Sequence, residues 1–138
     1  MKTTLDRQGL GASIALAVQF ALGMIINLYV EFPADTSPHT QWEFAIRNPF
    51  IVAHLVIGTL IVLGAVTMVV RAIRQNTTTW KLPAAFGLVS VLAAWIAGDT
   101  FVTTQADLLS YAMSLAFLLA ILSYGWGIYR ASHSSASK

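Results

Sequence analysis

The chain has 138 residues, of which 57% are apolar and only 10% are charged, and its formal net charge is +2. Soluble domains carry roughly a quarter charged residues, so this composition excludes an ordinary soluble domain, a disordered chain and a nucleic-acid-binding domain with a basic face. Cysteine is absent, which excludes disulfides, thiolate metal sites, iron–sulfur clusters and cysteine nucleophiles.

Long uncharged stretches divide the chain into four apolar segments. A helix needs about 20 largely apolar residues to cross the hydrocarbon core of a bilayer. The pattern therefore predicts four membrane spans, at about residues 9–30, 49–70, 82–103 and 108–129. Residues 31–48 are predicted to form an outer loop, kept non-helical by its prolines, and residues 131–138 a disordered tail. A single all-α membrane domain of residues 1–138 follows.

The basic residues predict how the chain lies in the membrane. All but one fall on one side of a four-span topology, where Asp6 is the only acid: Lys2, Arg7, Arg71, Arg74, Lys81, Arg130 and Lys138. The opposite side holds Arg47 and the other five acids. Positively charged loops stay on the cytoplasmic side, so both termini are predicted to be cytoplasmic. We expect an integral protein of the plasma membrane of a prokaryote.

The connections between spans predict the bundle. Short links join the second span to the third and the third to the fourth, so these pairs are antiparallel neighbours in an up-down-up-down four-helix bundle. In a cyclic bundle of this kind, the second and fourth spans face each other across the diagonal. Asp99 and Asp107 flank the turn between the third and fourth spans, and we expect them to mark its boundaries.

His54 lies in the first turns of the second span, about 7–9 Å below the outer boundary. An ionisable side chain at that depth usually faces the bundle interior and has a partner there. Neutral imidazole is a strong ligand for haem iron, and Gly58, one turn further on the same face, would let a flat macrocycle approach the helix. The structural alternative is a hydrogen bond from His54 to another span, with Gly58 serving close helix packing.

Met113, on the fourth span, lies about 9 Å below the same boundary, so its depth matches that of the histidine. Thioether sulfur is a known axial haem ligand; Met24 on the first span is a rival, and either methionine could simply fill space. Gln19, Gly23 and Asn27 follow one another at four-residue spacing on one face of the first span. The polar side chains of Gln19 and Asn27 could bond the histidine or a haem propionate, or make helix–helix contacts.

Two stretches carry a family resemblance. The first span reads VQFALGM at Val18–Met24, and the second reads NPFIVAHLVIG at Asn48–Gly58. A Gln-x-x-Leu-Gly span, an outer loop and an Ala-His-Leu span resemble one four-helix half of the heme A synthase family. In that eight-span family, each half holds a haem between histidines on diagonal helices, and the resemblance implies that His54 is a haem ligand.

The chain also departs from the pattern of that family. The histidine of the fourth span is absent, and Met113 stands near its place. The glutamate that precedes the histidine of the second span by three residues would fall at Ile51, and the loop cysteine pair is missing. These departures argue against haem hydroxylation. What the resemblance still implies is a single bundle that binds haem.

The sequence thus predicts a membrane-embedded b-type haem protein whose single haem b lies near the outer face, with His54 and Met113 as iron ligands and Met24 as fallback. The other residues expected at the haem are Gly58, Gln19 and Asn27. We expect electron transfer with a quinone or a redox protein, or haem or gas sensing or handling, and neither catalytic residues nor a stand-alone enzymatic activity. The alternatives are a small four-span transporter acting as a homodimer and a non-catalytic subunit of a membrane complex. No nucleic-acid partner is expected.

Overall fold

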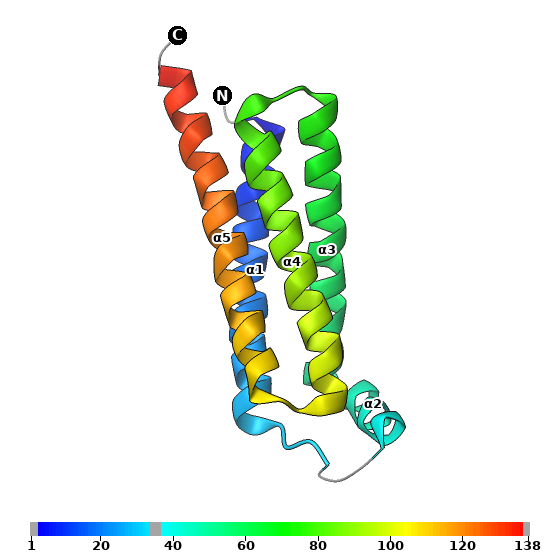
Figure 1. Cartoon of the computed structure of the whole chain (residues 1–138). Coiled ribbons are helices and arrows are strands. Elements are labelled where there is room, and N and C mark those ends of the chain that lie inside the picture. The colour runs from blue at the N-terminus through cyan, green and yellow to red at the C-terminus, as the bar shows by residue number, and fades with distance from the viewer. Residues whose placement is uncertain (1–2, 34–36, 137–138) are drawn as a thin grey trace.

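A computed structural model describes residues 3–33 and 37–136 of the chain (Figure 1). Within this part, the chain forms five α-helices: α1 (Thr4–Tyr29), α2 (Pro38–Arg47), α3 (Pro49–Arg74), α4 (Thr78–Thr104) and α5 (Asp107–Ala136). Four of them, α1, α3, α4 and α5, are long and apolar enough to cross a membrane. The predicted all-α four-helix bundle is therefore confirmed.

The first long helix starts earlier than the residue 9 predicted for its span, because polar side chains cap it. The backbone N–H of Asp6 donates to Oγ1 of Thr3 at 3.2 Å, and the N–H of Thr3 donates to Oδ2 of Asp6 at 2.8 Å. This reciprocal capping box satisfies two N–H groups that the first turn of a helix otherwise leaves without acceptors.

The segment predicted as a non-helical loop contains α2, so that prediction was wrong. Pro38 occupies the first position of the helix, where its missing N–H is not needed and its fixed φ suits the helix. The hydroxyl of Ser37 accepts the N–H of Thr40 at 3.3 Å and caps the same end. Asn48 is the single residue between α2 and α3. It ends α2, and its side chain accepts hydrogen bonds from the N–H groups of Phe50 and Ile51 at the start of α3.

The tail predicted to be disordered from residue 131 is helical instead, because α5 continues to Ala136. Oγ of Ser132 donates to the carbonyl of Tyr129 at 2.7 Å, and Nδ1 of His133 lies 3.0 Å from the same oxygen. The rings of Tyr129 and His133 also pack together, with centroids 4.1 Å apart. These side chains therefore contact the preceding turn of α5, which the polar composition of the tail does not reveal. Residues 137–138 lie outside the described part.

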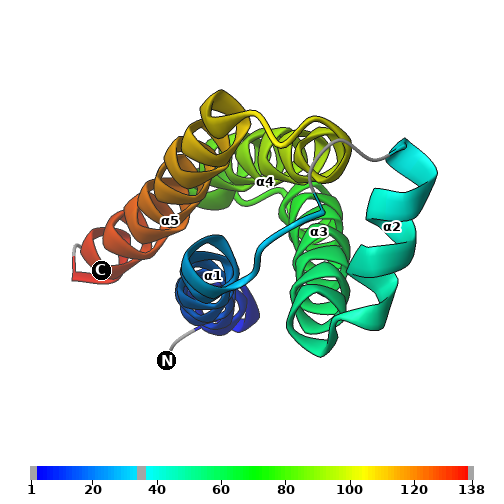
Figure 2. The ribbon, with the colours of Figure 1, turned by 90° about the horizontal axis from the view of Figure 1, so that it is seen from below.

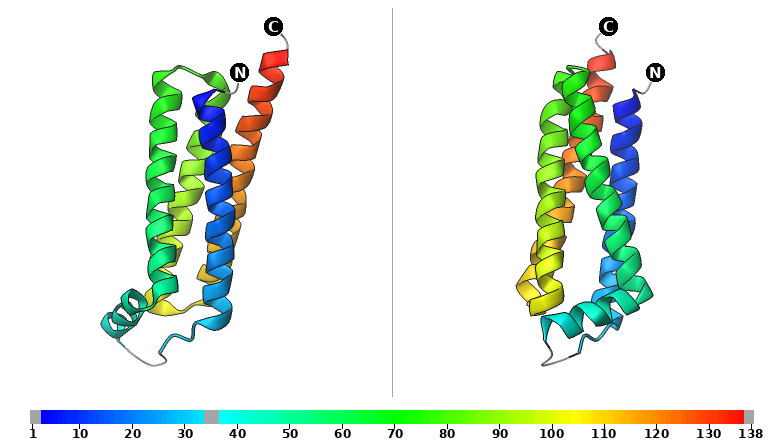
Figure 3. Two further views of the ribbon diagram at one scale, coloured as in Figure 1. Left: turned by 180° about the vertical axis from the view of Figure 1, so that it is seen from behind. Right: turned by 90° about the vertical axis from the view of Figure 1, so that its right-hand side faces the viewer.

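The four long helices form a ring, seen end-on in Figure 2. Helix α1 packs against α3 and α5, and α4 packs against the same two helices. Helices α3 and α5 are therefore diagonal, as predicted for the second and fourth spans. Helix α2 lies outside the ring at one end, against α3 and α4 (Figures 2 and 3). We call this the α2 end, and the opposite end, where α1 starts and α5 finishes, the terminal end.

The terminal half of the bundle is tightly packed around Trp80 of α4, which is almost completely buried. Its indole N–H donates to Oδ1 of Asp6 on α1 at 3.0 Å. Its ring lies against Gly9 of α1 and Gly127 of α5, where an added Cβ would collide with it. The buried indole thus fills the space between α1, α4 and α5 in this half of the bundle.

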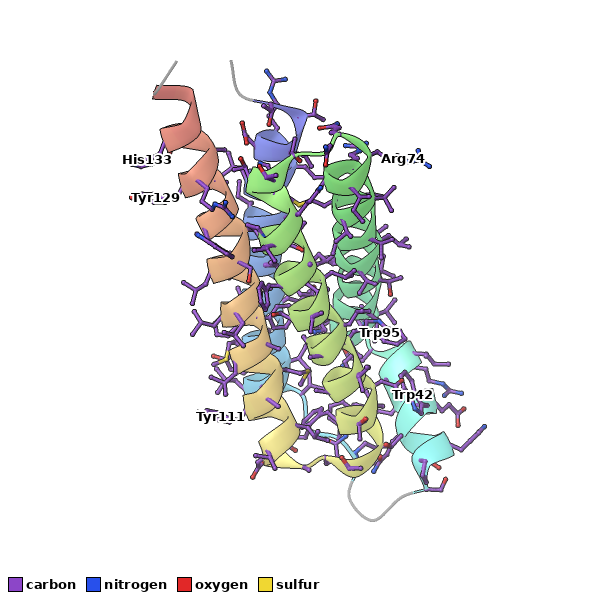
Figure 4. All side chains as sticks on the ribbon, turned by 45° about the horizontal axis from the view of Figure 1, so that its top comes forward. Trp42, Arg74, Trp95, Tyr111, Tyr129 and His133 are labelled. Carbon is purple, nitrogen blue, oxygen red and sulfur yellow. The ribbon has the colours of Figure 1, made fainter. Side chains whose placement is uncertain are left out.

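The outer surface of the bundle is apolar. Large hydrophobic side chains on every long helix face away from the ring, among them Leu28, Leu60, Val89 and Leu118. An exterior of this kind suits lipid chains, and in water it would be an aggregation surface. Figure 4 places Arg74, Tyr129 and His133 toward the terminal end, and Trp42 and Tyr111 toward the α2 end.

Candidate functional site

A cavity of about 740 Å³ lies between the long helices toward the α2 end. All four long helices line it, together with α2 and the segment that follows α1. Cofactor and small-molecule sites commonly have volumes of roughly 300–1,000 Å³ and mostly apolar walls with a few polar groups. Every residue that the sequence singled out for haem binding lines this cavity: His54, Met113, Met24, Gly58, Gln19 and Asn27.

His54 reaches the cavity from α3 and lies beside α1. A Cβ at Gly23 would come within 3.1 Å of Cε1 of the imidazole, so the absence of a side chain there makes room for the ring. Nδ1 of His54 is buried and has no hydrogen-bond partner among the described residues. The structure thus places the imidazole beside the cavity, in the space that the missing side chain of Gly23 leaves.

Gln19 is fully buried and joins α1 to α3 beside the histidine. Its Nε2 donates to the backbone carbonyl of His54 at 2.7 Å, so it bonds the main chain rather than the imidazole. Because a carbonyl can only accept, this bond also fixes the orientation of the amide. Oε1 of Gln19 is then a buried acceptor for which the described residues supply no donor.

Gly58 was expected to leave room for a haem, but in the structure the room beside it is occupied by Gln19. A Cβ at Gly58 would lie 3.0 Å from Nε2 of Gln19, so the space beside this glycine holds the Gln19 amide. Gly58 lines the cavity, and its missing side chain lets α1 and α3 approach closely enough for the bond from Gln19 to the His54 carbonyl.

Met113 enters the cavity from α5, the helix diagonal to that of the histidine. Its sulfur lies close to Gly98 of α4, where a Cβ would be 3.2 Å away. Met24 lines the cavity from α1. Asn27 accepts a hydrogen bond from the hydroxyl of Ser110 at 3.3 Å, which ties α1 to α5 near the α2 end.

Two carboxylates that the sequence did not assign to a site also line this cavity. Asp99 on α4 and Asp107 at the start of α5 both line it, although they were expected only to bound a turn. Asp99 lies within α4, which continues to Thr104. A carboxylate inside a helix, and not in the turn after it, was the feature of the sequence that could have indicated this position in the site. Gln41 of α2 was also missed; with its amide nitrogen turned toward α4, it donates to the carbonyls of Val102 and Thr103 at 2.7 and 2.9 Å.

The side chains that line the cavity include two types that can bind haem iron. An imidazole and a thioether from diagonal helices line one cavity, and the remaining iron ligands would come from the porphyrin itself. The cavity wall contains no lysine or arginine within the described part of the chain, so hydroxyl and amide groups would have to meet the propionates. The described residues also contain no group of three or more His, Asp or Glu side chains that could hold a bare metal ion.

Comparison with protein families, with curated proteins and with solved structures found no match to this chain. The class of protein that the structure itself defines is a bundle of four helices able to cross a membrane, with a ligand-sized cavity at one end.

Proposed function

We propose that this protein is a membrane-embedded b-type haem protein that acts in electron transfer or in the sensing or handling of haem or gases. One observation carries the proposal: His54 on α3 and Met113 on the diagonal helix α5 line the same cavity of about 740 Å³. The resemblance of the first and second spans to the heme A synthase family points in the same direction.

In this proposal, His54 would hold the haem iron through its imidazole, and Met113 would supply a further ligand, with Met24 as the alternative. When bound, the haem would supply one-electron redox chemistry, and a thioether ligand would raise its potential. Gln19 positions the turn of α3 that carries the histidine through its bond to the His54 carbonyl. Apolar side chains of the cavity, which include Ile51 and Phe117, would pack against the macrocycle.

The membrane orientation is part of the same proposal. Arg7, Arg71, Arg74, Lys81 and Arg130 belong to helix segments at the terminal end, and the positive-inside rule assigns that end to the cytoplasm. The cavity would then face the outside of a prokaryotic plasma membrane. A quinone in the bilayer or a redox protein on the outer surface is the expected electron partner.

The test is the absorption spectrum of purified protein supplied with haem, for the wild type and for His54→Ala. We expect a Soret band with the wild type and its loss in the variant. His39→Ala and His133→Ala are matched controls, because both residues are exposed and neither lines the cavity. A wild type that stays colourless with haem would overturn the proposal, and so would a His54→Ala variant that binds haem as the wild type does.

A further inference from the structure

A chain of hydrogen bonds holds the side chain of Arg71 where α1 and α3 lie side by side (Figure 2). Its Nη1 donates to Oε1 of Gln8 at 3.1 Å. Nε2 of Gln8 donates in turn to Oγ1 of Thr67 at 3.0 Å and to the carbonyl of Gly64 at 3.1 Å. These bonds turn the amide oxygen of Gln8 toward the guanidinium, so a neutral group positions Arg71 and leaves its charge intact.

Arg74 adds a second positive charge next to Arg71. Both arginines belong to the last turn of α3, and residues three apart on a helix are neighbours on its surface. Both side chains are exposed, and the ion pair found among the described residues joins Glu43 to Arg47, at the α2 end. The negative end of a helix dipole amounts to about half a charge, so it leaves most of the charge of the two arginines unbalanced.

The described part of the chain offers these arginines no carboxylate. Asp6 is the acid of the terminal end, and it bonds other groups: Oδ1 accepts the indole N–H of Trp80 at 3.0 Å, and Oδ2 accepts the N–H of Thr3 at 2.8 Å. The remaining described acids belong to the α2 end, namely Glu31, Glu43, Asp99 and Asp107. An anion that balances Arg71 and Arg74 is therefore expected from outside this part of the chain.

The position of the two arginines along α3 suits a lipid phosphate. The helix has 26 residues, more than the about 20 that cross the hydrocarbon core, so its last turn lies at the level of the lipid headgroups. The planar guanidinium of arginine matches the geometry of a phosphate and bonds it through two N–H groups.

The surface beside the Gln8 amide also leaves room for an acyl chain. Gly11 follows Gln8 by one turn of α1, and Gly64 supplies the carbonyl to which Gln8 bonds. A Cβ at either glycine would meet no atom within 4 Å, so the space next to both is open. An apolar chain can approach the backbone of α1 and α3 there, directly below a positioned positive charge.

We propose that Arg71 and Arg74 bind the phosphate of an anionic phospholipid whose acyl chains lie along α1 and α3, beside Gly11 and Gly64. Gln8 is a positioning residue, which holds the guanidinium of Arg71 without neutralising it. The site lies at the terminal end of the bundle and shares no residue with the cavity, so it is independent of haem binding.

The experiment measures binding of dioleoylphosphatidylglycerol and dioleoylphosphatidylcholine to the purified full chain in an uncharged detergent, by native mass spectrometry. The wild type should bind the anionic lipid about tenfold more tightly than the zwitterionic one, and Arg71→Gln should reduce this preference to about twofold. Arg130→Gln is the matched control, because it removes the same charge from the terminal end of α5, where Cζ of Arg130 lies 5.3 Å from the ring centroid of Trp126. A wild type without the preference, or an equal loss in both variants, would overturn the site.

Two substitutions of Gln8 test how Arg71 is positioned. Gln8→Glu keeps the length of the side chain but places a carboxylate beside the guanidinium, so an ion pair within the protein should replace the lipid phosphate and abolish the preference. Gln8→Met leaves every charge in place but removes the bond to Arg71, and its preference should fall between those of the wild type and Gln8→Glu. An unchanged preference in Gln8→Glu would remove Arg71 from the site.

Inorganic phosphate distinguishes a lipid site from a site for a soluble anion. At the concentration of the lipid it should not displace dioleoylphosphatidylglycerol, because it has no acyl chains; displacement would assign the arginines to a soluble anion and overturn the proposal. Unchanged binding of dioleoylphosphatidylcholine shows that each variant is folded. His54→Ala should lose the haem spectrum and keep the lipid preference, whereas Arg71→Gln should do the reverse, so the two proposals fail separately.

Discussion

The side-chain amide of Gln19 donates a hydrogen bond of 2.7 Å to the backbone carbonyl of His54 and leaves its own oxygen buried without a donor among the described residues. This pairing places α1 and α3 in register beside the cavity. It also buries an acceptor for which the described residues supply no donor, and a buried polar atom of this kind is rare in folded proteins.

Replacing Gln19 with methionine should leave the ligand-free protein as stable as the wild type, or more stable. The substitution loses one hydrogen bond, worth about 1 kcal/mol, but removes a buried unsatisfied oxygen that costs about 1–3 kcal/mol. Thermal unfolding in detergent is the measurement. As a contrast, Gln41→Met should lower the midpoint, because the Gln41 amide makes two bonds to carbonyls of α4 and leaves no such cost to relieve. A clear fall in the midpoint of Gln19→Met would show that Oε1 has a partner within the protein.

If haem binds at His54, replacing Met113 with leucine should convert a low-spin spectrum into a high-spin one. Leucine matches methionine in bulk but has no sulfur, so the proposed thioether ligand would be lost while packing is kept. The absorption spectrum of the oxidised and reduced protein reports the change. Met24→Leu is the matched control, and a spectral change in that variant with none in Met113→Leu would assign the ligand to α1 instead of α5.

Gly127→Ala should destabilise the bundle by about 1–3 kcal/mol, because a Cβ at this position collides with the buried ring of Trp80. Trp80 is held on its other side by Gly9 and by its bond to Asp6, so it has no room to yield. Denaturant unfolding in detergent measures the difference. Gly125→Ala, two residues away, meets no atom within 4 Å and should stabilise the helix by up to about 1 kcal/mol. The same response from both variants would contradict the packing around Trp80.

The predicted orientation can be tested with single cysteines, because the chain has none of its own. His39→Cys places a thiol on the exposed side of α2, and Asn76→Cys places one in the turn between α3 and α4. A membrane-impermeant thiol reagent added to intact cells should label the first variant at once and the second only after the membrane is opened. The reverse pattern, or labelling of both variants in intact cells, would contradict cytoplasmic termini.

Much of the fold could be predicted from the sequence, because crossing a bilayer depends on the length and polarity of a segment. The four long helices follow from uncharged runs, and their ring order follows from short connections. Helix ends were predicted less well. A proline was taken as a helix breaker although Pro38 starts α2, and the polar tail was taken as disordered although its side chains bond back to α5. Both errors concern local hydrogen bonds that composition does not describe.

The sequence by itself determined that the chain has four apolar helices and that His54 and Met113 lie at similar depth on helices two apart in the ring. Only the tertiary structure decided how each helix is rotated. That rotation aims Gln19 at the main chain of α3, seats Trp80 between two glycines, and adds Asp99 and Asp107 to a common cavity with the histidine. The physical reason is that spacing along a helix fixes which residues share a face, while packing against the other helices fixes where that face points.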